Sequence, residues 1–218
     1  MEEGRTTFDN VRKVTFFLVS TGVAEIITIF ATLLLRWPLP FLPAQILWLN
    51  LVTNGVQDVA LAFESGERDA LRRPPRPRSE GVLSRLLWER TILAGLVMAL
   101  GTLYLFSWEL SRGGTLAHAQ TLALTTMVLF QAYHVGNCRS ERLSIFTRSP
   151  FSNPLLLIST SAALAVHIGA LYFPPAQFVL RLEPLPLESW PRMALVAASI
   201  VAAMEAHKLL RTPRARGV

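Results

Sequence analysis

The sequence predicts an all-α polytopic membrane protein, a bundle of six transmembrane helices. Hydrophobic residues make up 51% of the 218 residues and charged residues only 17%. The mean hydropathy is +0.39, and such a composition is too apolar for a soluble domain. Apolar stretches of membrane-crossing length recur along the chain. Prolines fall at or just outside the ends of these stretches, where a missing N–H costs least.

Each of the six stretches has its own signal. The first is about 21 residues long, enough to cross a hydrocarbon core of roughly 30 Å at about 1.5 Å per residue. A Pro-rich turn at 37–43 introduces the second, and the fourth is shorter and more polar. The sixth is the weakest because Glu205, His207 and Lys208 crowd its end. We expect a stalk at 1–14, spans at 15–35, 44–63, 91–108, 121–136, 154–173 and 193–210, and a tail at 211–218.

The basic residues indicate the orientation. Of the 21 Lys and Arg residues, 17 fall at the two chain ends and in the second-to-third and fourth-to-fifth connections. By the positive-inside rule, this side and both termini are cytoplasmic. The net charge of +6 and the pI of about 10.4 therefore reflect the placement of basic residues on one side of the membrane, which argues against a nucleic-acid partner. We expect an integral protein of a bacterial-type plasma membrane, with the lipid bilayer as its surroundings. The four basic residues of the opposite side are Arg36, Arg112, Arg181 and Arg192.

Two other features bear on function. The basic, Pro-rich connection at 64–90 acts as a topogenic loop or contacts anionic lipid or a soluble domain, and the sequence leaves these alternatives open. Cys138 is the single cysteine, so a disulfide framework and a C-x-x-C metal or redox motif are excluded.

Glu25 stands alone in the middle of the first span. A carboxylate halfway along such a helix costs roughly 2.5–3.5 kcal/mol on the more lenient insertion scale. Residues of this kind usually face a polar interior and contact an ion, a proton or a partner. The alternative is a protonated or paired Glu that only holds helices together.

The second span carries a polar stripe opposite an apolar face. The spacing i, i+3, i+4, i+7 and i+8 places its members on one side of a helix. Because the short turn makes the two spans antiparallel, Glu25 and Asn54 lie at similar depth. Glu25 is ten residues from the cytoplasmic end of its predicted span, and Asn54 is ten residues from the outer end of the next. Asp58 lies about 6 Å closer to the cytoplasm. The stripe consists of Asn50, Thr53, Asn54, Gln57 and Asp58.

Carboxylate, amide and hydroxyl oxygens that converge near the membrane midplane predict a cation site. Hard oxygen ligands suit Na⁺, K⁺, Ca²⁺, Mg²⁺ or a proton rather than copper or zinc. The alternative is inter-helix hydrogen bonding, worth roughly 0.6–2 kcal/mol per contact. In the fourth span His134 is either a packing residue or a proton carrier, His167 in the fifth is interpreted as structural, and Cys138 is given no role. The candidate ligands are Glu25, Asn50, Thr53, Asn54, Asp58 and Gln131.

Four segments resemble the C-terminal membrane half of P-type cation-transporting ATPases, the group of calcium, sodium–potassium and proton pumps. Residues 2–13 resemble the stalk that leads into the fifth pump helix, and residues 20–25 (STGVAE) resemble the ion-binding stretch of that helix. Residues 47–55 (LWLNLVTNG) resemble the signature of the sixth helix, and residues 72–76 (RRPPR) follow at the usual place in the next loop. The resemblance implies that the six spans correspond to pump helices five to ten.

The resemblance also implies roles for single residues. Glu25, Asn50, Thr53 and Asn54 align with cation-coordinating positions, and Gln131 aligns with a position in the eighth pump helix. Reticulum-type calcium pumps carry Asn, Asp and Glu where Gly22, Asn54 and Gln131 stand. These departures favour a monovalent ion, a proton, or one ion rather than two, since a divalent ion loses favourable electrostatics. The family usually has Pro at the position of Gln57, so unwinding of this helix would depend on Gly55.

The phosphorylated Asp-Lys-Thr-Gly motif of these pumps and a glycine-rich nucleotide loop are missing from the sequence. We therefore expect the transport half of a pump, unable to hydrolyse ATP by itself. Its expected partners are the actuator, phosphorylation and nucleotide domains, which would bind ATP and Mg²⁺, and the first four pump helices. The transported cation is left open among Ca²⁺, Na⁺, K⁺ and H⁺. The alternatives are a stand-alone secondary transporter or channel, and an inert membrane scaffold.

Overall fold

A computed structural model describes residues 2–65, 81–141, 143–147 and 149–211. Within these residues every regular element is a helix, as the sequence predicts. Three predicted features lie wholly or mostly outside this part of the chain. They are the Arg-Pro-Pro motif at 72–76, most of the basic connection at 64–90, and the tail at 211–218 apart from its first residue.

Helix α1, Glu2–Leu34, contains the predicted stalk and the first predicted span without a break. At about 1.5 Å per residue its 33 residues extend for about 50 Å, which is longer than the hydrocarbon core. Arg36 ends the helix in the left-handed conformation with φ 54°, and the Trp37 N–H donates to the Thr32 carbonyl at 2.9 Å. The division between stalk and span stays a prediction.

The second predicted span is three helical segments in succession. They are α2, Pro43–Trp48, the π-helix η1, Leu49–Asn54, and α3, Gly55–Ala62. At the end of η1 the Gly55 N–H donates to the carbonyl of Asn50, five residues earlier. Short π segments are rare and frequently occur at functional sites. The helix therefore widens in the middle of the predicted polar stripe.

The other predicted spans are helices with shifted ends. Helix α4 begins at Arg85 rather than at 91 because Ser84 caps it, its hydroxyl accepting from the Leu87 N–H at 3.3 Å. The turn between the third and fourth predicted spans contains Gly113 at φ +83°. One short helix, α7, was not predicted. The helices are α4 (Arg85–Ser111), α5 (Leu116–Cys138), α6 (Pro154–Tyr172), α7 (Pro174–Leu180) and α8 (Ser189–Arg211), with the 3₁₀ turns η2 (Ile145–Thr147) and η3 (Pro150–Ser152).

Four of these helices, α1, α4, α6 and α8, are long and apolar enough to cross a membrane. Helix α5 has the length but carries several Thr, Gln and His side chains. The π-helix divides the second predicted span into segments too short to qualify alone. The described residues thus form an all-helical bundle with apolar membrane spans, and the number of six crossings stays a prediction.

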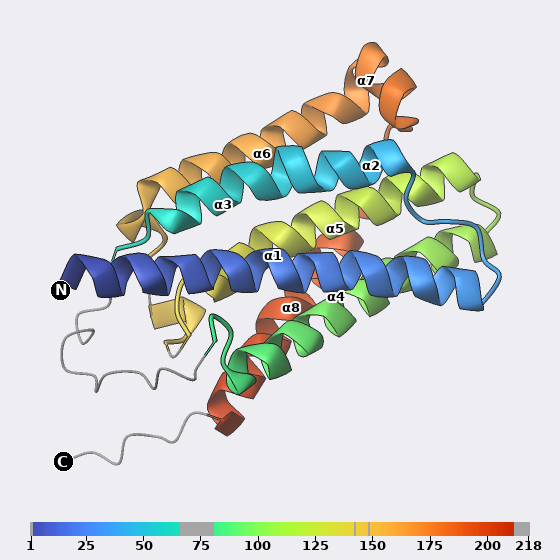
Figure 1. Ribbon diagram of the computed structural model, residues 1–218. Helices are drawn as coiled ribbons and strands as arrows, with labels where there is room; N and C mark the ends of the chain where they lie inside the picture. The colour runs from blue at the N-terminus through green and yellow to red at the C-terminus, as the bar shows by residue number, and fades with distance from the viewer. Residues whose placement is uncertain (1, 66–80, 142, 148, 212–218) are drawn as a thin grey trace.

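Helix α5 lies in the middle of the bundle (Figure 1). Helices α3 and α6 pack together on one side of it and α4 and α8 on the other, while α1 packs against α3, α4 and α5. Most side chains of α5 are buried. Helix α1 begins and α8 ends at the same end of the bundle, which we call the terminal end (Figure 1). Polar groups on α5 are therefore enclosed by its neighbours.

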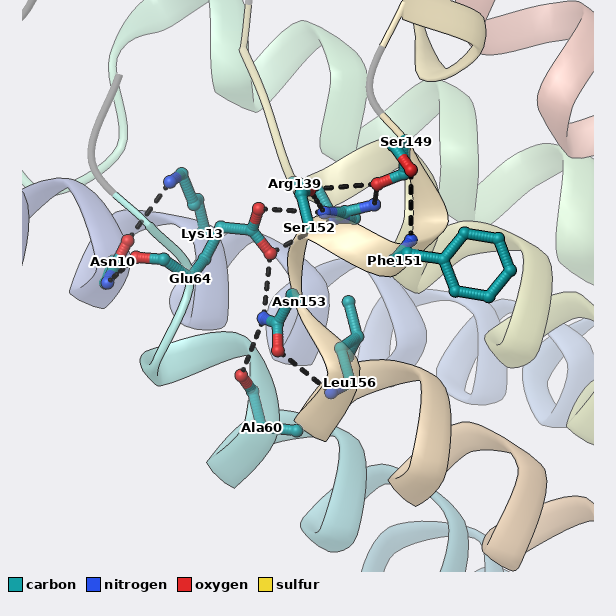
Figure 2. A network of polar contacts seen from close by, with 10 residues as sticks. All are labelled: Asn10, Lys13, Ala60, Glu64, Arg139, Ser149, Phe151, Ser152, Asn153 and Leu156. Carbon is teal, nitrogen blue, oxygen red and sulfur yellow. Dashed lines mark hydrogen bonds and ion pairs between the residues drawn. The ribbon is translucent and has the colours of Figure 1, made fainter. Parts of the chain in front are cut away.

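A polar network holds helices together at the terminal end (Figure 2). The Glu64 carboxylate, just beyond α3, accepts from the Arg139 guanidinium in two contacts of 3.0 and 3.1 Å. Asn153, which caps α6, donates to Glu64 Oε2 at 2.9 Å, and Asn10 on α1 donates to the Glu64 carbonyl at 2.7 Å. The side chains of Glu64 and Arg139 are 0% and 8% exposed. This network joins α1, α3, α5 and α6 and was missed by the sequence prediction.

Close packing of α4 against α1 depends on Gly95. A Cβ at this position would lie 2.5 Å from Cγ1 of Val23, a distance that side chains do not adopt. We expect Gly95→Ala to destabilise the bundle by about 1–3 kcal/mol through overpacking. The free energy of unfolding, measured by denaturant titration in micelles, checks this.

Gly169 on α6 provides the matched control, because a Cβ there meets nothing within 4 Å. Gly169→Ala should leave stability unchanged or raise it by up to about 1 kcal/mol, since Ala favours a helix interior. Equal effects of the two substitutions would contradict the close α1–α4 contact.

Candidate cation-binding site

Glu25 faces the inside of the bundle, with 6% of its surface exposed, whereas the neighbouring Ile26 is 57% exposed. Its Oε2 accepts a hydrogen bond from Nδ2 of Asn50 at 2.9 Å. Its Oε1 is buried and has no hydrogen-bond partner among the described residues. The structure therefore places the acidic side chain of α1 against the second predicted span.

The π-helix changes which members of the polar stripe are buried and which are exposed. Two backbone carbonyls accept hydrogen bonds from side chains four residues later: Ile46 from Asn50 Nδ2 at 3.0 Å, and Leu49 from the Thr53 hydroxyl at 2.6 Å. Asn50 is exposed on the surface of the described chain, while Thr53 is fully buried. The predicted stripe is thus divided. Its remaining members are Asn54 and Gln57, which are buried, and Asp58, which is half-buried.

Two further contacts connect this segment to α5 and α1. The Thr53 hydroxyl lies 2.5 Å from Oε1 of Gln131, whose side chain is fully buried. Nδ2 of Asn54 donates to the Thr21 hydroxyl at 3.1 Å. Thr21 was not among the predicted ligands, although its position four residues before Glu25 places both on one face of the helix. The structure brings together Glu25 with Asn50, and Thr53 with Gln131.

Four oxygens of this region are buried and unpaired. A buried acceptor without a donor costs about 1–3 kcal/mol, so each needs a partner outside the described protein atoms. Two of the four belong to carboxylates, and all four are hard ligands that suit an alkali or alkaline-earth cation. In the part of the chain that the structure describes, no three His, Cys, Asp or Glu side chains group as a metal site, so amide and hydroxyl oxygens would have to complete the shell. The unpaired atoms are Glu25 Oε1, Asn54 Oδ1, Gln57 Oε1 and Asp58 Oδ1.

His167 supports the segment from the other side. The Trp48 indole N–H donates to its Nδ1 at 3.2 Å, so its Nε2 carries the proton and donates to the Thr125 hydroxyl at 3.0 Å. These contacts join α6 to α2 and α5 one residue before the π-helix begins. A supporting role agrees with the interpretation of His167 as structural. Its partners lie on other helices, so spacing within one helix could not reveal them.

Comparison with known proteins adds an independent observation. The family described as "Cation transporting ATPase, C-terminus" matches residues 38–210. The chain is 36% identical over 191 residues, 87% of its length, to a "Calcium-transporting ATPase" of Bacillus subtilis. It is 32% identical over 216 residues, 99% of its length, to a "Probable cation-transporting ATPase F" of Mycobacterium bovis. It is also 32% identical over 210 residues, 96% of its length, to a "Calcium-transporting ATPase type 2C member 2" of Mus musculus. These alignments cover 21%, 24% and 22% of the relatives, so the chain spans less than a quarter of their length.

Proposed function

Because the chain belongs to the family of cation-transporting ATPase C-termini, we propose that it holds the transported cation of a pump near the middle of the membrane. The cation lies between α1, the α2–α3 segment and α5. The observation that carries this proposal is the set of four buried, unpaired oxygens on α1 and the second predicted span, which includes one carboxylate atom each of Glu25 and Asp58. Glu25 ligates the ion, and Asn50, Thr53, Asn54, Asp58 and Gln131 complete or border its shell.

The proposed site implies six membrane crossings with both termini in the cytoplasm. Helices α1, α4, α6 and α8 qualify as spans by apolarity alone. The α2–α3 segment and α5 join them because most of their polar side chains, although not that of Asn50, are buried in the bundle interior, where lipid does not reach. Arg36, Arg112 and Arg181 follow helices at the opposite end and Arg192 lies in the first turn of α8, whereas most of the other described basic residues belong to the terminal end. This asymmetry supports a cytoplasmic terminal end.

We propose one Ca²⁺ ion as the ligand. Two of the relatives are named calcium-transporting ATPases. The Glu25 carboxylate would ligate the ion directly, and Asp58, about two turns beyond Asn50 along the second predicted span, would add a second negative charge at longer range. Asn54 and Gln131 are neutral where reticulum-type calcium pumps carry acids, which leaves too little negative charge for a second divalent ion. A monovalent ion or a proton is the competing outcome.

The remaining parts of the pump are proposed as partners because the chain covers under a quarter of its relatives. Actuator, phosphorylation and nucleotide domains would bind ATP and Mg²⁺, and further helices would complete the membrane part. Phosphorylation there would tilt α1, which is continuous from Glu2 to Leu34. Such a tilt alternates the access of the site between the two sides of the membrane.

Equilibrium binding of radioactive Ca²⁺ to the chain in lipid nanodiscs tests the proposal. We expect one saturable Ca²⁺ per chain that excess K⁺ does not displace. Saturable binding of Na⁺ or K⁺ without Ca²⁺ would replace the divalent assignment with a monovalent one. Passive cation flux through liposomes would indicate a channel or secondary transporter, and neither binding nor flux would indicate an inert scaffold.

Asn54→Asp should raise the affinity for Ca²⁺ by about tenfold, or about 1.4 kcal/mol, because it adds a negative charge beside the proposed ion. The Thr21 hydroxyl, 3.1 Å from the side chain, can donate to the new carboxylate. Calcium titration in nanodiscs measures the change. Asn137→Asp, the same substitution elsewhere in the bundle, is the control and should leave affinity unchanged; unchanged or weaker binding in N54D would contradict the placement of the ion.

A further inference from the structure

Two arginines gather over one tryptophan at the end of the bundle opposite the terminal end. The centroid of the Trp108 ring, near the end of α4, lies 3.7 Å from the guanidinium carbon of Arg192 and 4.9 Å from that of Arg112. Arg112 directly follows α4, and Arg192 lies in the first turn of α8. Two helices that are distant in the sequence thus bring two positive charges to one aromatic side chain.

These two charges have no anionic partner within the described residues, where neither arginine forms a hydrogen bond or an ion pair. Because both contact the same ring, they lie within the Debye length of about 10 Å at 0.1 M ionic strength and repel each other. Glu109, one turn before Arg112, contacts His118 at 3.8 Å instead. The first turn of α8 has no acidic residue, so the positive end of the helix dipole adds to the charge of Arg192. Glu188, just before α8, is exposed. This surface therefore attracts an anion.

The aromatic contact positions the two guanidinium groups without using their hydrogen-bond donors. An arginine over an aromatic face is attracted by the negative face of the ring, while its N–H groups point outward in the guanidinium plane. These donors match the oxygens of a phosphate group, which a guanidinium binds through two parallel hydrogen bonds. A phosphodiester between the two arginines would accept from both and reduce their repulsion.

Exposed apolar side chains continue from the arginine pair along the outside of the bundle. On α4, Tyr104 and Leu100 lie one and two turns before the tryptophan, and they are 56% and 62% exposed. On α8, Leu195 lies one turn beyond the arginine and is 76% exposed. The two helices are in close contact here, because a Cβ on Gly101 would lie 2.9 Å from Cγ1 of Val196. A molecule with a phosphate and long apolar chains fits this surface better than a free phosphate does.

We propose that Arg112 and Arg192, held over Trp108, bind the phosphate of one anionic phospholipid of the phosphatidylglycerol class. Its acyl chains lie along Tyr104, Leu100 and Leu195, and its headgroup joins the end of α4 to the start of α8. A zwitterionic lipid binds less well, because its amine adds a third positive charge beside the two guanidinium groups. Since this end is opposite the side that we propose to be cytoplasmic, the lipid belongs to the outer leaflet.

Photoactivatable phosphatidylglycerol and phosphatidylcholine, each with a diazirine in the acyl chain, test the site in nanodiscs that contain the chain. Peptide mass spectrometry counts the lipid adducts on residues 100–108 and 192–199. Arg112→Gln combined with Arg192→Gln removes both charges of the site. Arg36→Gln combined with Arg181→Gln is the matched control, because both residues are exposed arginines that follow helices at the same end. Phosphatidylcholine adducts and circular dichroism check that the variants fold.

We expect phosphatidylglycerol to label these residues roughly tenfold more than phosphatidylcholine, because charge-assisted hydrogen bonds favour it. R112Q/R192Q should reduce this labelling to the phosphatidylcholine level, whereas R36Q/R181Q should not change it. Equal labelling by the two lipids, or an equal loss in the two double variants, would overturn the site. If excess inorganic phosphate abolishes the preference, the site binds a soluble anion and the lipid assignment is wrong. The site shares no residue with the candidate cation site, so Ca²⁺ binding in R112Q/R192Q should be unchanged and the two proposals fail independently.

Discussion

Glu25→Gln is expected to weaken Ca²⁺ binding by a factor on the order of 100, or about 2.7 kcal/mol. The substitution keeps the size of the side chain but removes its negative charge. The Glu25 side chain is 6% exposed and lies beside the proposed divalent ion. Charge interactions in such surroundings are much stronger than in water. Asn50 can still donate to the amide oxygen of the substituted side chain, so the α1–η1 contact of 2.9 Å survives. Binding is therefore affected far more than folding.

Radioactive Ca²⁺ binding in nanodiscs measures this effect, with helix content by circular dichroism as the check on folding. Glu109→Gln is the control with the same chemical change. Glu109 lies near the end of α4 that is opposite the terminal end of the bundle, and the variant should bind Ca²⁺ like the original chain. In an intact pump that contains this segment, the same substitution should abolish ion-stimulated ATP turnover. Normal Ca²⁺ affinity in E25Q would end the assignment of Glu25 as a ligand.

Glu64→Gln is expected to destabilise the bundle by about 3–5 kcal/mol, because breaking a buried ion pair leaves an uncompensated charge. Arg139 would keep its buried guanidinium without the carboxylate that accepts from it at 3.0 and 3.1 Å (Figure 2). The hydrogen bond that Asn153 donates to the same carboxylate would weaken as well. The free energy of unfolding in micelles measures the loss.

A double substitution separates the charge effect from general damage. Glu64→Leu combined with Arg139→Met removes both charges and should cost less than E64Q alone, since a well-packed apolar pair can replace a buried ion pair. Arg85→Gln, which breaks an ion pair with Glu89 at 3.7 Å, is the exposed control and should change stability by less than about 1 kcal/mol. A loss in E64Q no larger than that in R85Q would show that the network does not hold the helices together.

Composition and hydropathy were sufficient to predict the helical class and the approximate helix positions. The ends were less accurate because caps extend helices into polar sequence, as Ser84 does for α4. The π-helix at Leu49–Asn54 could not be predicted. The hydrogen bond from the Gly55 N–H to the carbonyl five residues earlier does not produce a recognisable hydrophobic periodicity in a segment of six residues. For the same reason the exposed position of Asn50 differs from that of the buried Thr53, although both belonged to one predicted stripe.

Contacts between distant residues mark the other limit of the sequence prediction. Glu64 stood in the predicted basic connection at 64–90, and its burial depends on Arg139, 75 positions later. The partners of His167, Trp48 and Thr125, lie on different helices. Glu25, in contrast, was recognisable because a carboxylate in an apolar helix is costly unless it has a partner. The sequence therefore predicts which groups need partners better than which partners they have.

The most direct test locates the cation itself. Crystals of the chain grown with Ca²⁺ would give an anomalous difference peak at the ion. We expect the peak within about 2.3–2.6 Å of a Glu25 carboxylate oxygen, with further oxygen ligands from the α2–α3 segment. A peak elsewhere in the bundle, or a structure in which Glu25 faces the acyl chains, would contradict a cation site between α1, the α2–α3 segment and α5.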